Sequence, residues 1–471
     1  MIEDGGGALD ACLAAAFMTW VLMPDMCGLG GDLFALWCDG DGAASVTGAG
    51  PSPAQYPGAG DNRAALALVP GAPTALTALK PHLKLPLAHL LAPAIAVAEH
   101  GFLAHPLMMR KLATLPGGAF RDDLLASWHW AEGKPLRWPA MAKTLKRLAA
   151  GEDPNDLVRE ALPAWRAAGA LLTAADLDAY RATIEQPLRM DVAGWRFFGH
   201  AKMSQSVATL GALLRAGPDW LLEPANGINA AAKTHAMIEA YKAVYADVAD
   251  FGHAGDADAV IARLLDPARA RAGRATLGPA ASEGPPMARN YGETTQVAAV
   301  DRSGRVCTLI HSLYRPFGAR ALCRETGLIV NDRGGSFTDG ANAPAPRQRP
   351  RHTLVGIVAQ APGGLRLALG TPAAQAQTQT TLQVIASLMA RPDDSLDAVL
   401  APRWGFVGGK TIEVEADMPA AILGDLAARG HQLALRPARD WLMGSVSLAS
   451  VRDGVSSATA DDRRNALALA L

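Results

Sequence analysis

Two hydroxyl residues near the middle of the chain, Thr294 and Ser312, have side chains suited to nucleophilic chemistry. A threonine at the start of a strand is most often only a β-former, and its hydroxyl is a weak nucleophile until a base lies beside it. If the chain is cut before Thr294, the freed α-amine of that residue is such a base, because it titrates near ~8 and can take the hydroxyl proton. Thr294 is therefore a candidate nucleophile only if the chain is cut before it.

A β-hairpin predicted over residues 293–312 would position these side chains. Residues 296–301 and 306–312 are rich in β-formers. The segment Arg302-Ser303-Gly304 between them is typical of a three-residue loop that places glycine at positive φ.

The register of this hairpin follows from its loop. If Asp301 and Arg305 close the loop, the numbers of paired residues add up to 606, and Ser312 lies opposite Thr294. A slip of one residue would offer His311 instead. We expect the Ser312 hydroxyl to hydrogen-bond the threonine hydroxyl and to hold its rotamer.

Composition argues against several classes of protein. The net charge is −1 and only 19% of the residues are charged, so no strong field would gather nucleic acid or an anionic membrane. The five cysteines show no CxxC spacing and predict buried thiols rather than disulfides or a zinc site. The sequence contains no apolar run of about 18 residues that would predict a membrane span. The start MIEDGGG has no basic segment, so we expect no signal peptide and a cytoplasmic protein.

The remaining chain predicts mainly helices around this hairpin. The glycines of CGLGGD (residues 27–32) favour close backbone packing over a nucleotide site. Four histidines (His82, His89, His100 and His105) are expected on the surface or at helix ends, and no metal or cofactor is predicted. Helices are expected over residues 9–23, over most of 72–215, after an N-cap at Thr173, and over 229–249 and 420–429. Residues 266–286 are expected to form a mobile connector.

The ordered motifs of the chain resemble those of the γ-glutamyltransferase family of N-terminal-nucleophile (Ntn) hydrolases. The matching segments are GGGALDACLAAAF (5–17), MPDMCGLGGDLF (23–34), VPGAPTAL (69–76), TT (294–295), VAAVDRSGRV (297–306), FG (317–318), TGLIVND (326–332), RPRHTL (349–354), APRW (401–404) and ADDRR (460–464). They follow one another in the family's order and cover essentially the whole chain.

The resemblance implies a fold and a processing event. The fold is a mixed α/β (α+β) fold, a four-layer αββα sandwich of the Ntn-hydrolase type with a helical large-subunit region. Cleavage between Glu293 and Thr294 would give a large segment, 1–293, and a small segment, 294–471, interwoven in one structural unit. The two fragments would form a heterodimer, and possibly a dimer of these.

The resemblance also assigns substrate-binding positions. Ser312 stands where the family has a hydroxyl residue that supports the nucleophile. Tyr314 and Arg333 replace an asparagine and a glutamine that bind the substrate's amino end, and Ser336 replaces an aspartate that pairs with the ammonium group. His352 and Thr353 stand where the family has two serines. The substituted pocket therefore favours an anion without a neighbouring ammonium, with a solvated Arg333 as the alternative.

Two further positions depart from the family. Thr47 stands in the place of the arginine that grips the α-carboxylate of a γ-glutamyl substrate, and Arg63 is the nearest other cation. Ala373 and Ala374 replace a paired-glycine turn whose N–H groups stabilise the oxyanion. Alanine keeps the N–H but resists positive φ. The segments QAQTQT, SLYRPFG and NDRGGSF resemble the oxamate amidohydrolase branch.

These observations predict an autoprocessed amidohydrolase that cleaves a small carboxylate-bearing amide, such as oxamate, through an acyl-threonine intermediate. One alternative is a γ-glutamyltransferase, a glutathione hydrolase or an acylase for glutaryl-type side chains. Another alternative is an uncut, non-catalytic relative that binds a ligand or partner.

Overall fold

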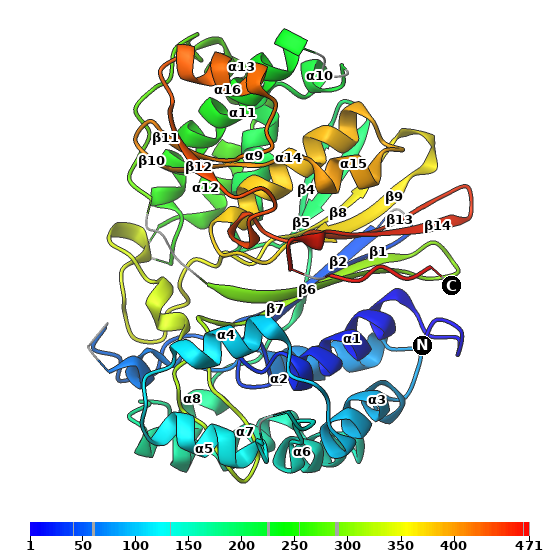
Figure 1. Cartoon of the computed structure of the whole chain (residues 1–471), viewed down its shortest axis with the longest axis vertical. Coiled ribbons are helices and arrows are strands. Elements are labelled where there is room, and N and C mark those ends of the chain that lie inside the picture. The colour runs from blue at the N-terminus through cyan, green and yellow to red at the C-terminus, as the bar shows by residue number, and fades with distance from the viewer. Residues whose placement is uncertain are drawn as a thin grey trace. The chain divides into compact units, whose positions relative to one another are not determined.

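The computed structural model describes residues 1–40, 42–58, 62–131, 133–223, 227–253, 255–287, 292–464 and 466–470. The chain forms two compact units (Figure 1). Unit 1 comprises Met1–Gln186, Gly292–Asp339 and Ala343–Pro350, and unit 2 comprises Pro187–Tyr291, Gly340–Asn342 and Arg351–Leu471. Each unit therefore takes residues from both sides of the predicted cleavage site.

Unit 1 is built on an antiparallel five-stranded sheet with the strand order β3-β2-β1-β7-β6. The strands are β1 (Asp32–Asp39), β2 (Gly42–Gly48), β3 (Ile184–Glu185), β6 (Glu293–Val300) and β7 (Val306–Tyr314). Strand β7 lies between β1 and β6, and all of its residues are buried. The strand that carries Ser312 is thus an inner strand of unit 1.

The β6–β7 hairpin has the predicted loop and register. The Asp301 N–H donates to the Arg305 carbonyl oxygen (3.0 Å), and Gly304 has a φ of 76°. From Val300↔Val306 to Thr295↔His311 the numbers of the paired residues add up to 606. Strand β6 begins at Glu293, earlier than the predicted start at residue 296.

Helices cover the sheet of unit 1. They are α1 (Ala8–Leu22), α2 (Ala72–Leu79), α3 (Leu87–His100), α4 (Pro106–Thr114), α5 (Ala119–Ser127), α6 (Pro139–Ala149), α7 (Pro154–Ala167) and α8 (Ala174–Asp178). Helix α1 packs on β6 and β7, and α2 packs on β1 and β2. Helices α3 and α7 contact α1 and α2 in turn, which makes a second helical layer (Figure 1).

The buried side chains of unit 1 include the cysteines, for which the sequence predicted burial. All five cysteines are buried and form no disulfide, and Trp128, Trp138 and Trp165 lie in the apolar cluster that contains four of them. His105 caps α4 by accepting a hydrogen bond from the Leu107 N–H, and the Thr173 hydroxyl caps α8. These side chains therefore have structural roles.

The glycines of CGLGGD allow the backbone to approach other strands closely. A Cβ atom on Gly31 would lie 2.5 Å from the Ser312 carbonyl oxygen, and one on Gly30 would lie 2.1 Å from the Ile329 carbonyl oxygen. Only glycine fits at such distances. The predicted packing role of this turn is confirmed.

Unit 2 contains a six-stranded sheet, a three-stranded sheet and their helices. The strand orders are β14-β13-β9-β8-β5-β4 and β10-β11-β12. The strands are β4 (Leu188–Val192), β5 (Trp195–Gly199), β8 (Gly356–Gln360), β9 (Arg366–Gly370), β10 (Trp404–Gly408), β11 (Thr411–Glu415), β12 (Gln432–Arg436), β13 (Ser447–Arg452) and β14 (Val455–Ala460). The helices are α9 (Ser206–Ala216), α10 (Pro218–Leu221), α11 (Gly227–Asp247), α12 (Ala257–Leu264), α13 (Pro267–Ala275), α14 (Ala376–Ala390), α15 (Ser395–Leu400) and α16 (Ala420–Ala428).

Helices α9, α14 and α15 pack on the larger sheet of unit 2, and α11 packs on α9. Helices α11 and α16 confirm two of the predicted helices. One expectation was wrong in part, because the stretch predicted as mostly helical also contains β3, β4 and β5. The segment expected to be a mobile connector contains α13, whose N-cap is Asp266.

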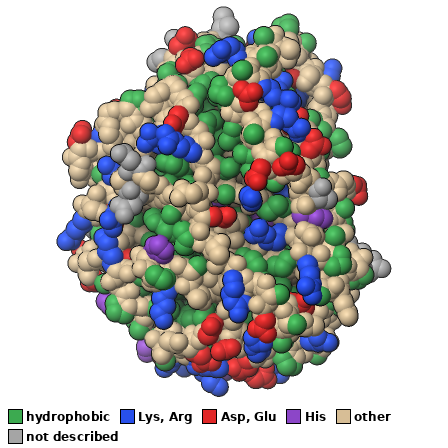
Figure 2. All heavy atoms as spheres, turned by 180° about the vertical axis from the view of Figure 1, so that it is seen from behind, with side chains coloured by type: hydrophobic (Ala, Val, Ile, Leu, Met, Phe, Trp, Pro, Cys, Tyr) green, Lys and Arg blue, Asp and Glu red, His purple; other side chains and the backbone are tan. Residues whose placement is uncertain are grey.

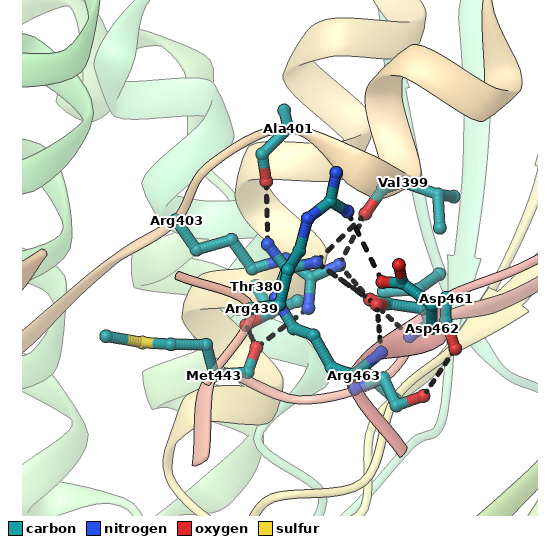
Figure 3. A network of polar contacts seen from close by, with 12 residues as sticks. Thr380, Val399, Ala401, Arg403, Arg439, Met443, Asp461, Asp462 and Arg463 are labelled. Carbon is teal, nitrogen blue, oxygen red and sulfur yellow. Dashed lines mark hydrogen bonds and ion pairs between the residues drawn. The ribbon is translucent and has the colours of Figure 1, made fainter. Parts of the chain in front are cut away.

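The motifs APRW and ADDRR meet in a buried ion network of unit 2 (Figure 3). The Arg403 guanidinium binds Asp461 (2.5 Å) and the carbonyl oxygens of Met443 and Val399. Arg463 binds Asp461 and Glu415. Burial lowers the pKa of Arg403 to about 10, and Asp461 opposes this effect. These family-like residues therefore stabilise the fold of unit 2.

The surface mixes charges of both signs. Figure 2 shows Lys and Arg side chains interspersed with Asp and Glu side chains over the face in view. Such mixing is consistent with the net charge of −1. Among the described helices, none has the length and apolar character needed to cross a membrane.

Candidate active site

Thr294 lies at a β-bulge in the hairpin. Glu293 pairs with Tyr314 while Thr295 pairs with His311, so Ser312 and Leu313 of β7 both lie across from Thr294. A bulge bends the strand locally and changes the direction of a side chain, and bulges are common beside active sites. Thr294 is buried, with 3% of its surface exposed. The hairpin thus places Ser312 across from Thr294, as predicted from the register.

The Ser312 hydroxyl contacts the bond that is predicted to be cut. It accepts a hydrogen bond from the Tyr314 N–H (2.7 Å) and donates one to the Glu293 carbonyl oxygen (2.5 Å). The bond that we expected to the Thr294 hydroxyl is therefore made, in this uncut chain, to the carbonyl of the residue before it. A donor at that oxygen would stabilise negative charge as it develops there.

His311 forms a second buried cluster beside the hairpin. The Trp20 indole N–H donates to His311 Nδ1 (2.9 Å), so Nε2 carries the proton and donates to the Thr295 hydroxyl. Burial lowers the pKa of His311 to about 3, which keeps the imidazole neutral. His311 therefore fixes Thr295, the residue after Thr294.

Arg333 is buried and paired rather than solvated, so the predicted alternative of a solvated side chain was wrong. Its Nε lies 2.7 Å from Asp32 Oδ2, and both side chains are 1% exposed. Its guanidinium carbon lies 4.7 Å from the centre of the Tyr314 ring. In the described residues Nη1 and Nη2 have no hydrogen-bond partner. These two buried nitrogens therefore have unused donor capacity.

Asp32 changes the charge expected for this pocket. Burial raises the pKa of Asp32 to about 6, although Arg333 opposes the shift. Above that pH the carboxylate compensates the Arg333 charge. The sequence alone had predicted an Arg333 charge without such a partner. Asp32 is the last residue of CGLGGD, 301 residues before Arg333.

Further arginines surround Asp332 in unit 1. The Arg63 Nε lies 2.9 Å from Asp332 Oδ2, and the Arg315 Nε lies 2.6 Å from the same oxygen. The pKa of Arg320 is lowered by burial, and Asp332 opposes this. Two arginines thus pair with one aspartate, and the Arg315 guanidinium carbon also lies 5.8 Å from the centre of the Tyr314 ring.

Three other predicted residues of unit 1 have local partners. Tyr314 has a φ of 79°, and its hydroxyl donates to the Gly335 carbonyl oxygen (2.9 Å). The Ser336 hydroxyl donates to the Arg333 carbonyl oxygen (2.8 Å). Thr47 is buried in β2, and its hydroxyl has no hydrogen-bond partner in the described residues. Residues 59 and 60 of the loop after Thr47 lie outside the described part of the chain.

Four predicted site residues belong to unit 2. His352 and Thr353 are buried, and the His352 N–H donates to the Met203 carbonyl oxygen (2.6 Å). Ala373 and Ala374 have φ values of 96° and 45°. Both alanines thus adopt the backbone conformation that favours glycine. Within the described chain their N–H groups donate no hydrogen bond.

One group of side chains in unit 2 has the composition of a metal site. His235, Glu239 and His431 are buried, and their ligand atoms lie within 4.8 Å of one another. His235 Nδ1 and His431 Nε2 are 2.9 Å apart, and Lys242 Nζ lies 2.8 Å from Glu239 Oε1. The Lys242 ammonium therefore supplies a positive charge to this carboxylate.

The whole chain, residues 1–471, matches the profile of the family described as Gamma-glutamyltranspeptidase. The chain belongs to this family. The acylase ACY 1 proenzyme of Pseudomonas sp. (strain SE83) is 31% identical over 380 residues, which are 75% of this chain and 66% of that protein. The oxamate amidohydrolase proenzyme of Klebsiella pneumoniae subsp. pneumoniae is 27% identical over 510 residues, covering 99% of this chain and 95% of that protein.

A solved structure confirms the predicted fold class. The structure of cephalosporin acylase from Bacillus halodurans matches 100% of this chain and 92% of its own, with a TM-score of 0.88 and 24% identity. This likeness shows the mixed helix-and-sheet fold. The predicted class of enzyme, an amide-bond hydrolase of this family, agrees with the names of the relatives.

Sequence reasoning missed several partners of the family residues. Asp32, which holds Arg333, lay in a motif that we interpreted only as a packing turn. His311 was considered only as the product of a register slip. Trp20, its partner on α1, gave no signal, because a tryptophan on a helix that is apolar on nearly all faces is typical of a core.

Proposed function

We propose that this member of the family is a self-processing amidohydrolase that is cut between Glu293 and Thr294. The observation that carries the proposal is the 2.5 Å hydrogen bond from the Ser312 hydroxyl to the Glu293 carbonyl oxygen. That carbonyl belongs to the peptide bond that must break. The relatives' names as proenzymes support a processing step.

The cut can be written with groups of the hairpin. The Thr294 hydroxyl oxygen attacks the Glu293 carbonyl carbon, and the Ser312 hydroxyl stabilises the oxyanion. The C–N bond then breaks, and the nitrogen takes up the proton that the hydroxyl has lost. An ester now joins the Glu293 carbonyl carbon to the Thr294 side-chain oxygen. Water hydrolyses this ester, which leaves a carboxylate on Glu293 and a free amine and hydroxyl on Thr294. The products are segments of 293 and 178 residues.

The freed Thr294 then acts on an external amide. Its amine takes the hydroxyl proton, the oxygen attacks the amide carbonyl, and the proton leaves with the amine product. Water clears the acyl group from the threonine oxygen. The assignment of the Ala373 and Ala374 N–H groups as oxyanion donors is part of this proposal. It is supported by their glycine-like backbone and by the absence of another acceptor among the described residues.

The substrate class proposed is a small amide that carries a carboxylate, and oxamate is the first to test. Arg333 supports this choice because Nη1 and Nη2 form the paired donor edge that matches a carboxylate. Thr47 and Ser336 stand in place of the family's arginine and aspartate, which argues against a γ-glutamyl group held in the usual way. The heterodimer, and a possible pairing of two heterodimers, are also proposals.

Two measurements test this function. A denaturing gel of fresh protein is expected to show two bands, of 293 and 178 residues, and Thr294→Ala protein is expected to show one. The cut protein is expected to release ammonia from oxamate. Arg333→Met should raise the KM for oxamate at least tenfold, while Arg189→Met, at an exposed arginine, should not. Cut protein that releases no ammonia would remove oxamate as the substrate.

A second candidate is an acylase, which the 31% identity to the acylase ACY 1 proenzyme favours. Glutathione hydrolase activity is the related alternative. Faster turnover of glutaryl or γ-glutamyl p-nitroanilide than of oxamate, lost in Thr294→Ala, would establish this candidate instead. A single full-length band on the denaturing gel would favour a non-catalytic binding protein.

A further inference from the structure

Glu293, the residue on the acyl side of the proposed cut, has its side chain in a buried group of three charges. Lys111 Nζ lies 3.0 Å from Glu293 Oε2 and 3.0 Å from Asp25 Oδ2. The exposed fractions of the side chains are 8% for Lys111, 0% for Asp25 and 2% for Glu293. Lys111 comes from α4, Asp25 from the turn after α1, and Glu293 from the first position of β6.

We propose that Lys111 is a positioning residue for self-cleavage, because it holds Glu293 while Thr294 attacks. This inference rests on the proposed function and adds a residue that the family resemblance did not indicate. It concerns the cutting of the chain rather than the turnover of an external amide.

The charges make Lys111 necessary for this arrangement. Two carboxylates share one ammonium in a site that excludes water. Burial raises the pKa of Asp25, and Lys111 opposes this shift. Asp25 Oδ1 has no hydrogen-bond partner in the described chain, so Asp25 depends on the ammonium for much of its compensation. Removal of one member of such a buried group leaves a charge uncompensated, and the structure must then protonate or expel a carboxylate.

The geometry connects this group to the bond that breaks. Lys111 holds the Glu293 side chain, and Ser312 holds the Glu293 carbonyl oxygen (2.5 Å). The Asp25 carbonyl oxygen accepts from the Phe317 N–H (2.8 Å), and the Met26 carbonyl oxygen accepts from the Leu313 N–H (2.7 Å). The group is thus tied to β7, the strand that provides Ser312, and to the segment that follows it.

Because Glu293 is held at its side chain by Lys111 and at its carbonyl oxygen by Ser312, the motion that self-cleavage has to overcome is limited. When reacting groups are held near the attack geometry, much of the entropic cost of bringing them together has been met in folding. If Lys111 is lost, the Glu293 carboxylate loses the ion pair that orients it, while the carbonyl keeps its Ser312 contact. The rate constant for self-cleavage should then fall while the fold of unit 1 remains.

The test compares Lys111→Met and Lys111→Arg with the unaltered protein. Purified full-length chain is incubated, and the appearance of the two segments is followed on denaturing gels from pH 6 to pH 9. Lys111→Met is expected to slow the cut at least tenfold, and Lys111→Arg, which keeps the charge, is expected to restore most of the rate. Lys146→Met, which removes an exposed lysine paired with Glu99, is the matched control and should cut normally.

Two further measurements separate positioning from general damage. Once Lys111→Met protein has matured slowly, its kcat should equal that of the unaltered protein, because Lys111 has no part in turnover. Glu293→Gln leaves the Lys111–Asp25 pair intact and should also cut slowly, so it replaces Lys111→Met if that variant does not fold. Cutting of both variants at the normal rate would overturn the inference. Failure of the unaltered chain to cut would instead overturn the proposed function.

Discussion

Arg333 and Asp32 form an ion pair of 2.7 Å in unit 1, in which Asp32 is the acidic residue that ends the glycine-rich turn. Asp32 has a raised pKa of about 6, because it is buried. The carboxylate is therefore ionised above about pH 6 and protonated below it. The charge that Arg333 can offer to a ligand accordingly increases as the pH falls.

This pair predicts a pH-dependent affinity for carboxylate substrates. The KM for oxamate should fall as the pH drops from 8 to 5, since protonated Asp32 no longer compensates the guanidinium. Asp32→Asn keeps an acceptor for Arg333 Nε and should give the low KM at pH 8, with a flat profile. KM is measured by ammonia release, and a profile in Asp32→Asn as steep as in the unaltered protein would contradict the assignment.

Ser312→Ala removes the donor to the Glu293 carbonyl oxygen and should slow self-cleavage roughly 100- to 1,000-fold, the usual effect of losing one oxyanion donor. Ser312→Thr keeps the hydroxyl and should cut faster than the alanine variant. The measurement is the rate of segment appearance on denaturing gels. Ser456→Ala, at an exposed serine of β14, is the control. Equal rates in Ser312→Ala and the control would show that the hydrogen bond is structural only.

The hairpin illustrates what the sequence could predict. A three-residue loop favours glycine at its third position, and the RSG segment has it there. Placing the loop on this segment predicts the register in which His311 pairs with Thr295. Local turn chemistry and alternation were enough, because the interacting residues lie close together in sequence. The bulge at Thr294 was not predictable in this way, since the shift depends on contacts of Glu293 and Tyr314 beyond the ladder.

Long-range pairs account for most of what was missed at the site. Asp32 and Arg333 are 301 residues apart, and nothing in either local segment specifies the other. Lys111 lies in a helix with ordinary composition, and its partners come from a turn and a strand. The region of β3, β4 and β5 was predicted as mostly helical because strands of two to five residues leave little periodic signal between long helices.

We expect replacement of Ala374 by glycine to stabilise the fold. Its φ of 45° costs an L-residue about 1 kcal/mol or more, and glycine avoids this cost. Ala374→Gly should therefore raise or preserve the midpoint of thermal unfolding and keep the N–H. Ala96→Gly, at an exposed site within α3, should lower stability by about 1 kcal/mol. Calorimetry that shows equal losses in both variants would contradict strain at Ala374.

Because His311 is buried and neutral, we expect the free energy of unfolding to fall in acid. The unfolded chain binds a proton on this imidazole below its ordinary pKa of 6.5, whereas burial lowers the pKa of folded His311 to about 3. The contribution of neutral His311 to the free energy of unfolding is therefore fully present above pH 6.5 and is lost as the pH falls toward 3. The slope is about 1.4 kcal/mol per pH unit for each such histidine. His200, whose pKa burial lowers to about 3, should add to it.

The measurement is the free energy of unfolding in urea at pH values from 7 to 4. His311→Gln removes the titrating group and should reduce the slope by about 1.4 kcal/mol per pH unit, even if its stability at pH 7 is lower. If His311→Gln retained the full slope, the imidazole would already be protonated in the folded chain, and its hydrogen bond with Trp20 could not have the assigned direction.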